Sequence, residues 1–238
     1  MDDDDNINLE ELLKSKEPKM PIEQNPPLMP QHPFRLIDAG PSGSGKTTIL
    51  FNALLKGQLN FQKLYIYAKD LEEEKYTMLI KHYSNIAEEM GVDINTMLVV
   101  GSEGEDIVDV NSLDPGLMHL FLFDDFICDR RSMDGKITEH WIRGRKKNAS
   151  YCFLAQSYYD IPKKIRLNSD YFMLFRFPET KSNQMIISEQ KGNLEYDKMK
   201  EVFNIATDGD HDWIFIDKKT KDPELKFRKG FKQPLKLT

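Results

Sequence analysis

Residues 40–47 have the residue types and the spacing of a loop that binds phosphate. Glycines at positions 40, 43 and 45 would let backbone N–H groups turn inward and approach phosphate oxygens closely. We expect Lys46 to reach the β- and γ-phosphates of a nucleotide and the hydroxyl of Thr47 to hold Mg²⁺. The sequence therefore predicts binding of a nucleoside triphosphate such as ATP. The predicted nucleotide-binding residues are Gly40, Pro41, Ser42, Gly43, Ser44, Gly45, Lys46, Thr47 and Thr48.

A second set of acidic residues follows an apolar run at 120–123. Asp124 and Asp125 come directly after this predicted strand, which is the arrangement of a Walker B element. Asp124 is expected to join the Mg²⁺ shell, and Asp125 to orient and polarise the water that attacks the γ-phosphate. The alternative is a pair of acids that only caps a turn. The loop upstream favours the catalytic interpretation, and a second acid favours hydrolysis over transfer to a hydroxyl.

Gln156 ends the next apolar run, at 151–155. This order is typical of the additional-strand class of P-loop ATPases, in which the strand after the Walker B element lies beside the strand of the phosphate loop. A glutamine amide can donate to the γ-phosphate and accept from water, so Gln156 is predicted to sense hydrolysis. The alternative is an exposed glutamine at a strand end.

Hydrolysis in rings of such ATPases often needs a cation from the neighbouring subunit. Arg143, Arg145 and Arg166 are the candidates. Arg145 is favoured, because a flexible Gly144 precedes it and the predicted sensor strand follows. The same arginines could instead contact DNA phosphates, and both interpretations stay open.

Apolar runs separated by helical stretches predict a mainly parallel sheet with helices on both faces, which is a three-layer α/β fold. The phosphate loop then lies where such sheets bind ligands, at the carboxyl ends of the strands. Strands are predicted at 34–39, 64–68, 97–100, 120–123, 151–155, 171–175 and 213–216, and residues 225–228 are predicted to pair back as a C-terminal hairpin. Helices are predicted at 47–55, 72–90 and 137–147, after Pro162, and once or twice within 180–204.

The 238 residues suffice for one α/β domain with an extension. Residues 1–32 are acidic and rich in proline, which predicts a mostly flexible arm around a short helix at 9–13, and the ATPase domain is predicted to span 33–238. No run is apolar enough to span a membrane, and the acidic start is unlike a secretion signal, so we expect an intracellular protein that is not secreted. Cys128 and Cys152 lack metal-ligand spacing and are expected to be reduced thiols.

The net charge of −6 hides two basic segments. Residues 130–166 carry ten Lys/Arg against three Asp/Glu, and residues 218–238 carry eight against two. Each segment is either a solvated surface or a contact for nucleic acid.

Taken together, residues 40–47, 120–125, 143–145, 155–157 and 161–168 resemble those of the poxvirus-type genome-packaging ATPases of the FtsK/HerA superfamily, and the chain looks like a member from a virophage or small virus. The resemblance covers roughly residues 34–231 and implies a RecA/FtsK-like fold. The run Ile-Pro at 161–162 followed by Ile-Arg-Leu-Asn at 165–168 is its most restrictive part. One departure is Lys146, where many members carry histidine, so the role of Arg145 is less firmly implied.

The resemblance implies a motor that hydrolyses ATP with Mg²⁺ and drives double-stranded DNA into a viral capsid. It implies a homo-oligomeric ring, a pentamer or hexamer, that acts at the capsid or portal vertex. The location would be the virion or the viral factory in the host cytoplasm. Contacts to DNA would be independent of sequence and sensitive to salt.

Two other classes of protein remain as alternatives. A nucleoside or nucleotide kinase fits the chain length but leaves Asp125, Gln156 and the basic segments unexplained. A P-loop assembly factor that does not translocate DNA could bind capsid protein through the acidic arm. Phosphate release stimulated by DNA would distinguish the motor from both.

Overall fold

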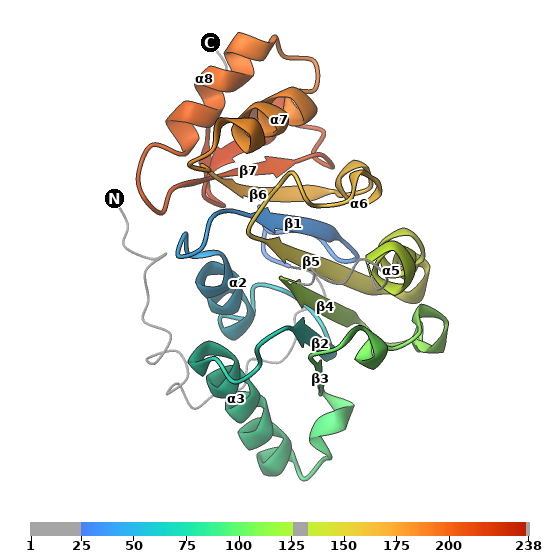
Figure 1. The fold of residues 1–238 in the computed structure, drawn as a ribbon. Helices are drawn as coiled ribbons and strands as arrows, with labels where there is room; N and C mark the ends of the chain where they lie inside the picture. The colour runs from blue at the N-terminus through green and yellow to red at the C-terminus, as the bar shows by residue number, and fades with distance from the viewer. Residues whose placement is uncertain (1–24, 126–132, 237–238) are drawn as a thin grey trace.

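A nine-stranded sheet runs through the part of the chain that the computed structural model describes, residues 25–125 and 133–236. Its strand order is β3-β2-β4-β5-β1-β6-β7-β8-β9, and Figure 1 shows the strands from β3 at the bottom to β7 near the top. The strands are β1 (Arg35–Ala39), β2 (Lys63–Ala68), β3 (Leu98–Gly101), β4 (His119–Asp124), β5 (Ala149–Ala155), β6 (Tyr171–Phe175), β7 (Trp213–Asp217), β8 (Phe227–Lys229) and β9 (Gln233–Pro234).

The strands from β3 to β6 are parallel, and β7, β8 and β9 continue the sheet in antiparallel fashion. β5 lies between β4 and β1, which confirms the predicted additional-strand order. The pairing of β8 with β7 confirms the predicted C-terminal hairpin. The short β9, which pairs with β8, was not predicted.

Helices cover both faces of the sheet, so the predicted three-layer α/β fold is confirmed. α2 (Lys46–Leu55) and α3 (Glu74–Met90) pack on one face, and α5 (Thr138–Arg143), α6 (Lys163–Leu167), α7 (Thr180–Gln190) and α8 (Tyr196–Ala206) pack on the other. The predicted helix at 137–147 is composite: α5 is preceded by a π-helical turn (Met133–Ile137) and followed by a 3₁₀ turn (Gly144–Lys147). It ends at Asn148, whose backbone is left-handed with φ 55°.

Aromatic side chains join the strands that carry the candidate site. Tyr65 of β2 stacks on Phe121 of β4 with ring centroids 4.1 Å apart, and Phe121 stacks on Tyr151 of β5 at 5.1 Å. All three are buried beneath the layer that contains α5. Such cross-strand aromatic pairs stabilise neighbouring strands beyond the area they bury. The core therefore fixes β2, β4 and β5 relative to one another.

The segment at 25–32 packs against the domain, although the sequence prediction placed it in the flexible arm. Met29 is buried, and the ring of His32 forms hydrogen bonds with Asn148 (2.9 Å) and Ser150 (2.6 Å) at the start of β5. The predicted boundary at 32/33 thus falls inside a packed segment. The proline-rich composition predicted flexibility, but these contacts hold the segment against the domain although it forms neither helix nor strand. The rest of the arm, with its predicted helix at 9–13, lies outside the described residues.

No helix in the described ranges is both long and apolar enough to cross a bilayer. Cys152 is buried in β5 as a free thiol, and burial raises its pKa. Cys128 lies outside the described residues.

Candidate nucleotide site

The phosphate loop connects β1 to α2 at the carboxyl edge of the sheet. Gly43 and Gly45 have positive φ angles, 76° and 98°, which side chains other than glycine rarely adopt. Gly40 needs its missing side chain for space, because a β-carbon there would lie 2.7 Å from a ring carbon of Phe175. The loop leaves the first N–H groups of α2 without side-chain caps. These groups and the helix dipole favour an anion.

Lys46 is buried at the start of α2 and turns back over the loop. Its Nζ donates to the carbonyl oxygens of Gly40 (2.6 Å) and Pro41 (2.8 Å). Burial lowers the pKa of Lys46, and the nearby carboxyl groups of Asp38 and Asp124 oppose that shift. Phosphate oxygens would be stronger acceptors than these neutral carbonyls. The loop therefore holds its lysine ready for an anionic ligand.

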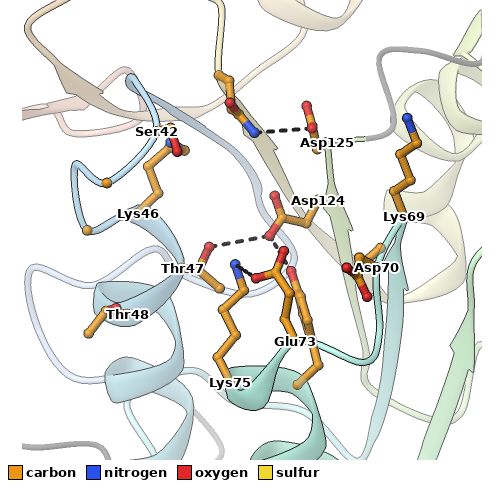
Figure 2. A pocket seen from close by; sticks show the side chains of 15 residues that line it. Ser42, Lys46, Thr47, Thr48, Lys69, Asp70, Glu73, Lys75, Asp124 and Asp125 are labelled. Carbon is orange, nitrogen blue, oxygen red and sulfur yellow. Dashed lines mark hydrogen bonds and ion pairs between the residues drawn. The ribbon is translucent and has the colours of Figure 1, made fainter.

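Asp124 ends β4 and faces Thr47 across the cavity (Figure 2). Its Oδ2 accepts hydrogen bonds from the Thr47 hydroxyl (3.3 Å) and from the hydroxyl of Tyr76. Burial raises the pKa of Asp124, and the Tyr76 hydrogen bond and the charge of Lys75 oppose the rise. A hydroxyl and a carboxylate this close are hard oxygen ligands of the kind Mg²⁺ takes beside nucleotide phosphates. The residues therefore fit the predicted magnesium site.

Asp125 and Gln156 meet above the same cavity. The Gln156 Nε2 donates to Asp125 Oδ2 at 3.2 Å, and both residues line the cavity with the phosphate loop. Asp125 has φ 55°, a left-handed conformation that is uncommon outside glycine but which aspartate tolerates better than most residues. This turn directs the two adjacent acids, Asp124 and Asp125, to different places. The structure thus brings together the predicted water-orienting acid and the predicted sensor.

The far wall of the cavity was missed by sequence reasoning. It consists of the residues that follow β2 and begin α3, namely Ala68, Lys69, Asp70, Glu73, Lys75 and Tyr76. Ala68 pairs with Asp124 in the sheet register, so the segment after β2 must pass close to the acid. Parallel strands place their following loops at one edge, and this rule could have indicated the wall. The cavity has a volume of about 680 Å³.

Asp38 in β1 is a second residue that the sequence reasoning missed. It is completely buried, and neither carboxyl oxygen has a hydrogen-bond partner among the described residues. Burial raises its pKa from 3.8 to about 8, with Lys46 opposing and Asp124 reinforcing the shift. An unpaired buried carboxyl is costly when ionised. Burial therefore favours the protonated form of Asp38 beneath the phosphate loop.

The arginine candidates lie elsewhere. Arg143 and Arg145 are exposed near the start of β5, so they occupy the amino edge of the sheet, opposite the cavity of their own subunit. Arg143 forms an ion pair with Glu139 at 2.6 Å. The prediction that Gly144 is flexible is wrong. The residue is buried, and a β-carbon there would lie 1.7 Å from the Tyr151 hydroxyl, so the position requires glycine for close packing.

Arg166 is accounted for by contacts within its own chain. Its guanidinium pairs with both carboxyl oxygens of Glu189 (2.9 and 3.0 Å) and donates to the carbonyl of Ile161. Only 5% of the side chain is exposed. This arrangement corrects the expectation that Arg166 is free to act in a neighbouring site or on DNA, because withdrawing its nearly buried guanidinium would break the two-point ion pair with Glu189 and the hydrogen bond to Ile161.

A second hollow, of about 590 Å³, lies on the other side of the phosphate loop. It shares Gly43, Gly45 and Thr48 with the first cavity and extends along α2 to the C-terminal hairpin. Its walls include the apolar side chains of Ile49, Trp213 and Phe231. A nucleotide in the loop thus has a partly apolar space next to its phosphates.

The fold and the site define an additional-strand P-loop nucleoside triphosphatase. Among solved structures, the chain resembles the genome packaging NTPase B204 from Sulfolobus turreted icosahedral virus 2 in complex with sulfate, with a TM-score of 0.57 and 13% identity over 85% of this chain and 97% of that chain. The same protein in complex with AMPPCP gives 0.56 and 14% over 85% and 98%. B204, the DNA-packaging ATPase from Sulfolobus turreted icosahedral virus, gives 0.56 and 12% over 86% and 100%.

At such low identity these likenesses bear on the fold alone. A search of curated proteins gave no match. The model of the Poxvirus A32 protein family matches residues 26–211. The chain therefore belongs to the poxvirus A32 family, which confirms the resemblance noted from its motifs.

Proposed function

We propose that this protein is an ATPase motor that moves viral double-stranded DNA into a capsid. The observation that carries the proposal is the meeting of the phosphate loop, Asp124, Asp125 and Gln156 at one cavity in a member of the poxvirus A32 family. The B204 proteins of the same fold are described as genome-packaging enzymes, which supports the assignment. Neither comparison supports the kinase or the assembly-factor alternative.

In the proposed complex, the triphosphate lies in the loop and the nucleoside extends into the hollow beside Ile49. Lys46 leaves the carbonyls of Gly40 and Pro41 and binds the β- and γ-phosphates. Thr47 and Asp124 would hold Mg²⁺, which, when bound, neutralises charge on the phosphates. Tyr76 keeps the Asp124 carboxylate in place through its hydroxyl.

Asp125 orients the attacking water and takes up its proton as the water oxygen bonds to the γ-phosphorus and the bond between that phosphorus and the β–γ bridging oxygen breaks, which releases ADP and phosphate. The amide of Gln156 donates to Asp125 and lines the cavity, so in the proposed complex it exchanges that contact for the γ-phosphate. Gln156 directly follows β5. A change of its hydrogen-bond partner from Asp125 to phosphate therefore reports the state of the nucleotide to the segment after Gln156. This is how one side chain can link chemistry to movement.

The motor requires other surfaces that we also assign by proposal. The exposed arginines at the amino edge, Arg143 and Arg145, would complete a neighbouring subunit's site in a ring of five or six copies, or contact DNA phosphates. The basic C-terminal segment that contains the exposed Lys219 and Lys221 adds positive charge for a sequence-independent DNA contact. Such a ring would act at the capsid vertex, in the virion or the viral factory.

The test is ATP hydrolysis by the purified protein with and without double-stranded DNA at low and moderate salt. The motor predicts stimulation by DNA that fades as salt rises, because phosphate contacts release counterions. The Lys46→Ala variant should show no turnover. Turnover that ignores DNA in a proven oligomer would contradict the motor, and retained activity in the variant would contradict the loop assignment.

A further inference from the structure

An ion pair stands on the wall of the cavity opposite the phosphate loop. Lys75 Nζ and Glu73 Oε2 are 2.7 Å apart, and both residues line the cavity. Glu73 precedes α3 and Lys75 lies in its first turn, so both belong to the wall that sequence reasoning missed. One-third of the Lys75 side chain is exposed. The pair is thus in contact with solvent inside the cavity.

Lys75 reaches toward the reacting end of the site. Figure 2 shows its side chain rising from the start of α3 toward Thr47 and Asp124. Its charge acts on both sides of the cavity: it helps oppose the burial that raises the pKa of Asp124, and it adds to the burial that lowers the pKa of Lys46. A cation that affects both groups lies close to the space between them, which is where the phosphates belong.

A triphosphate in the cavity needs more positive charge than the phosphate loop alone supplies. Its lining contains the cations Lys46, Lys69 and Lys75 and the acids Asp70, Glu73, Asp124 and Asp125. A triphosphate brings several further negative charges, and Lys46 is the one cation on the loop itself. A half-exposed lysine–glutamate pair is held weakly in water, whereas a phosphate oxygen carries more charge and offers a stronger hydrogen bond. These properties favour a phosphate oxygen over Glu73 as the partner of Lys75.

We infer that Lys75 is a second phosphate-binding lysine. It breaks its ion pair with Glu73 and binds the terminal phosphate of a bound triphosphate. The inference rests on the proposed function, since it concerns the same nucleotide. Glu73 then acts as a competitor that holds Lys75 while no phosphate is present. Because Lys75 lies in the first turn of α3, the exchange also makes the position of that helix sensitive to the length of the phosphate chain.

The test compares a non-hydrolysable ATP analogue with ADP by calorimetric titration of the full chain. Lys75→Met should weaken binding of the ATP analogue by about tenfold, the loss expected for one charged contact, and weaken ADP much less. Lys75→Arg should retain most of the preference for the triphosphate. Glu73→Gln should bind the ATP analogue at least as tightly as the original protein. The matched control is Lys81→Met, which removes an exposed lysine of α3 outside the cavity and should change neither affinity.

Two results would overturn the inference: unchanged affinity for both nucleotides in Lys75→Met, or an equal loss for both. A thermal melt of each variant separates misfolding from lost binding, and Lys75→Arg keeps the test decisive if Lys75→Met does not fold. Failure of the proposed function would look different, because DNA would then not stimulate ATP hydrolysis by the original protein, whatever the effect of Lys75→Met on nucleotide binding.

Discussion

Asp124 and Asp125 are neighbours in the chain but face different partners, because the backbone turns left-handed at Asp125. Asp124 is fixed by Thr47 and Tyr76 at the metal side of the cavity, whereas Asp125 pairs with Gln156. One backbone angle therefore directs two identical side chains to different partners, and we propose a separate role for each. A change at either position tests one role without the other.

Asp125→Asn should bind ATP with nearly unchanged affinity but hydrolyse it at least about 100-fold more slowly, because the amide cannot accept the proton of the attacking water. Asparagine also tolerates the left-handed backbone, so the fold should be preserved. Single-turnover kinetics and nucleotide titration measure the two effects separately. Asp70→Asn, an exposed acid of the same cavity, is the control. Lost binding with normal turnover of bound nucleotide would show that Asp125 does not orient water.

Asp38→Asn should make stability less dependent on pH. The carboxyl keeps its proton in the folded state up to about pH 8 but loses it near 3.8 when unfolded. The folded state therefore binds more protons in this window, and the free energy of unfolding falls as pH rises through it. Since asparagine cannot ionise, the variant should be more stable than the original protein at pH 8, by on the order of a few kcal/mol, and the gain should vanish near pH 4. Urea unfolding at several pH values checks this, and parallel curves would refute it.

At the scale of elements, β5 connects the nucleotide cavity at the carboxyl edge of the sheet with the exposed arginines at the amino edge. Its carboxyl end carries Gln156, and its amino end follows the turn that contains Gly144 and Arg145. The strand is paired on both sides, with β4 and β1, so it cannot shift without them. The close packing of Gly144 on Tyr151 fixes the start of the strand against α5.

Gly144→Ala should destabilise the protein by about 3 kcal/mol, because the new methyl group would overlap the ring of Tyr151 in a packed core. Gly135→Ala is the matched control, since a β-carbon there has open space. Thermal and urea unfolding of both variants measures the difference. Equal stabilities would show that close packing on Tyr151 does not require glycine at position 144.

The sequence predicted most of the elements and the centre of the site. Apolar strands and the spacing of the phosphate loop are local signals, so β1, β4 and β5 with Lys46, Asp124, Asp125 and Gln156 followed from them. The wall with Glu73 and Lys75 carries no local signal, because its role depends on which strands are neighbours. Asp38 looked like an ordinary polar residue of a strand. Arg166 was a candidate for contacts with a neighbouring subunit or DNA because its partner in its own chain, Glu189, is distant in the sequence.

At the scale of the whole molecule, the cavity and the exposed arginines lie at opposite edges of one sheet. Arg145 cannot serve the cavity of its own chain from the amino edge. A role in hydrolysis therefore requires a second copy whose cavity faces this edge, which is the geometry of a head-to-tail ring. The proposed role of Arg145 in hydrolysis thus depends on the proposed ring.

Mixing Arg145→Ala subunits with Lys46→Ala subunits tests this arrangement. Each variant alone should be inactive, but a mixed ring contains some interfaces that join an intact loop to an intact arginine. Activity should return to a fraction of the original level, measured as phosphate release after co-assembly. No recovery in rings shown to contain both variants would count against an arginine acting between subunits.

The last strand has a consequence for how copies can meet. β9 is two residues long and ends in Pro234, which has no N–H to donate, so this border of the sheet is a poor template for another strand. At the other border, β3 has only four residues. Within residues 25–125 and 133–236, neither border of the sheet thus favours backbone pairing between copies, so this part of the chain would contribute side-chain surfaces to the proposed ring. Such contacts can open and close with each turnover, which a shared sheet could not do.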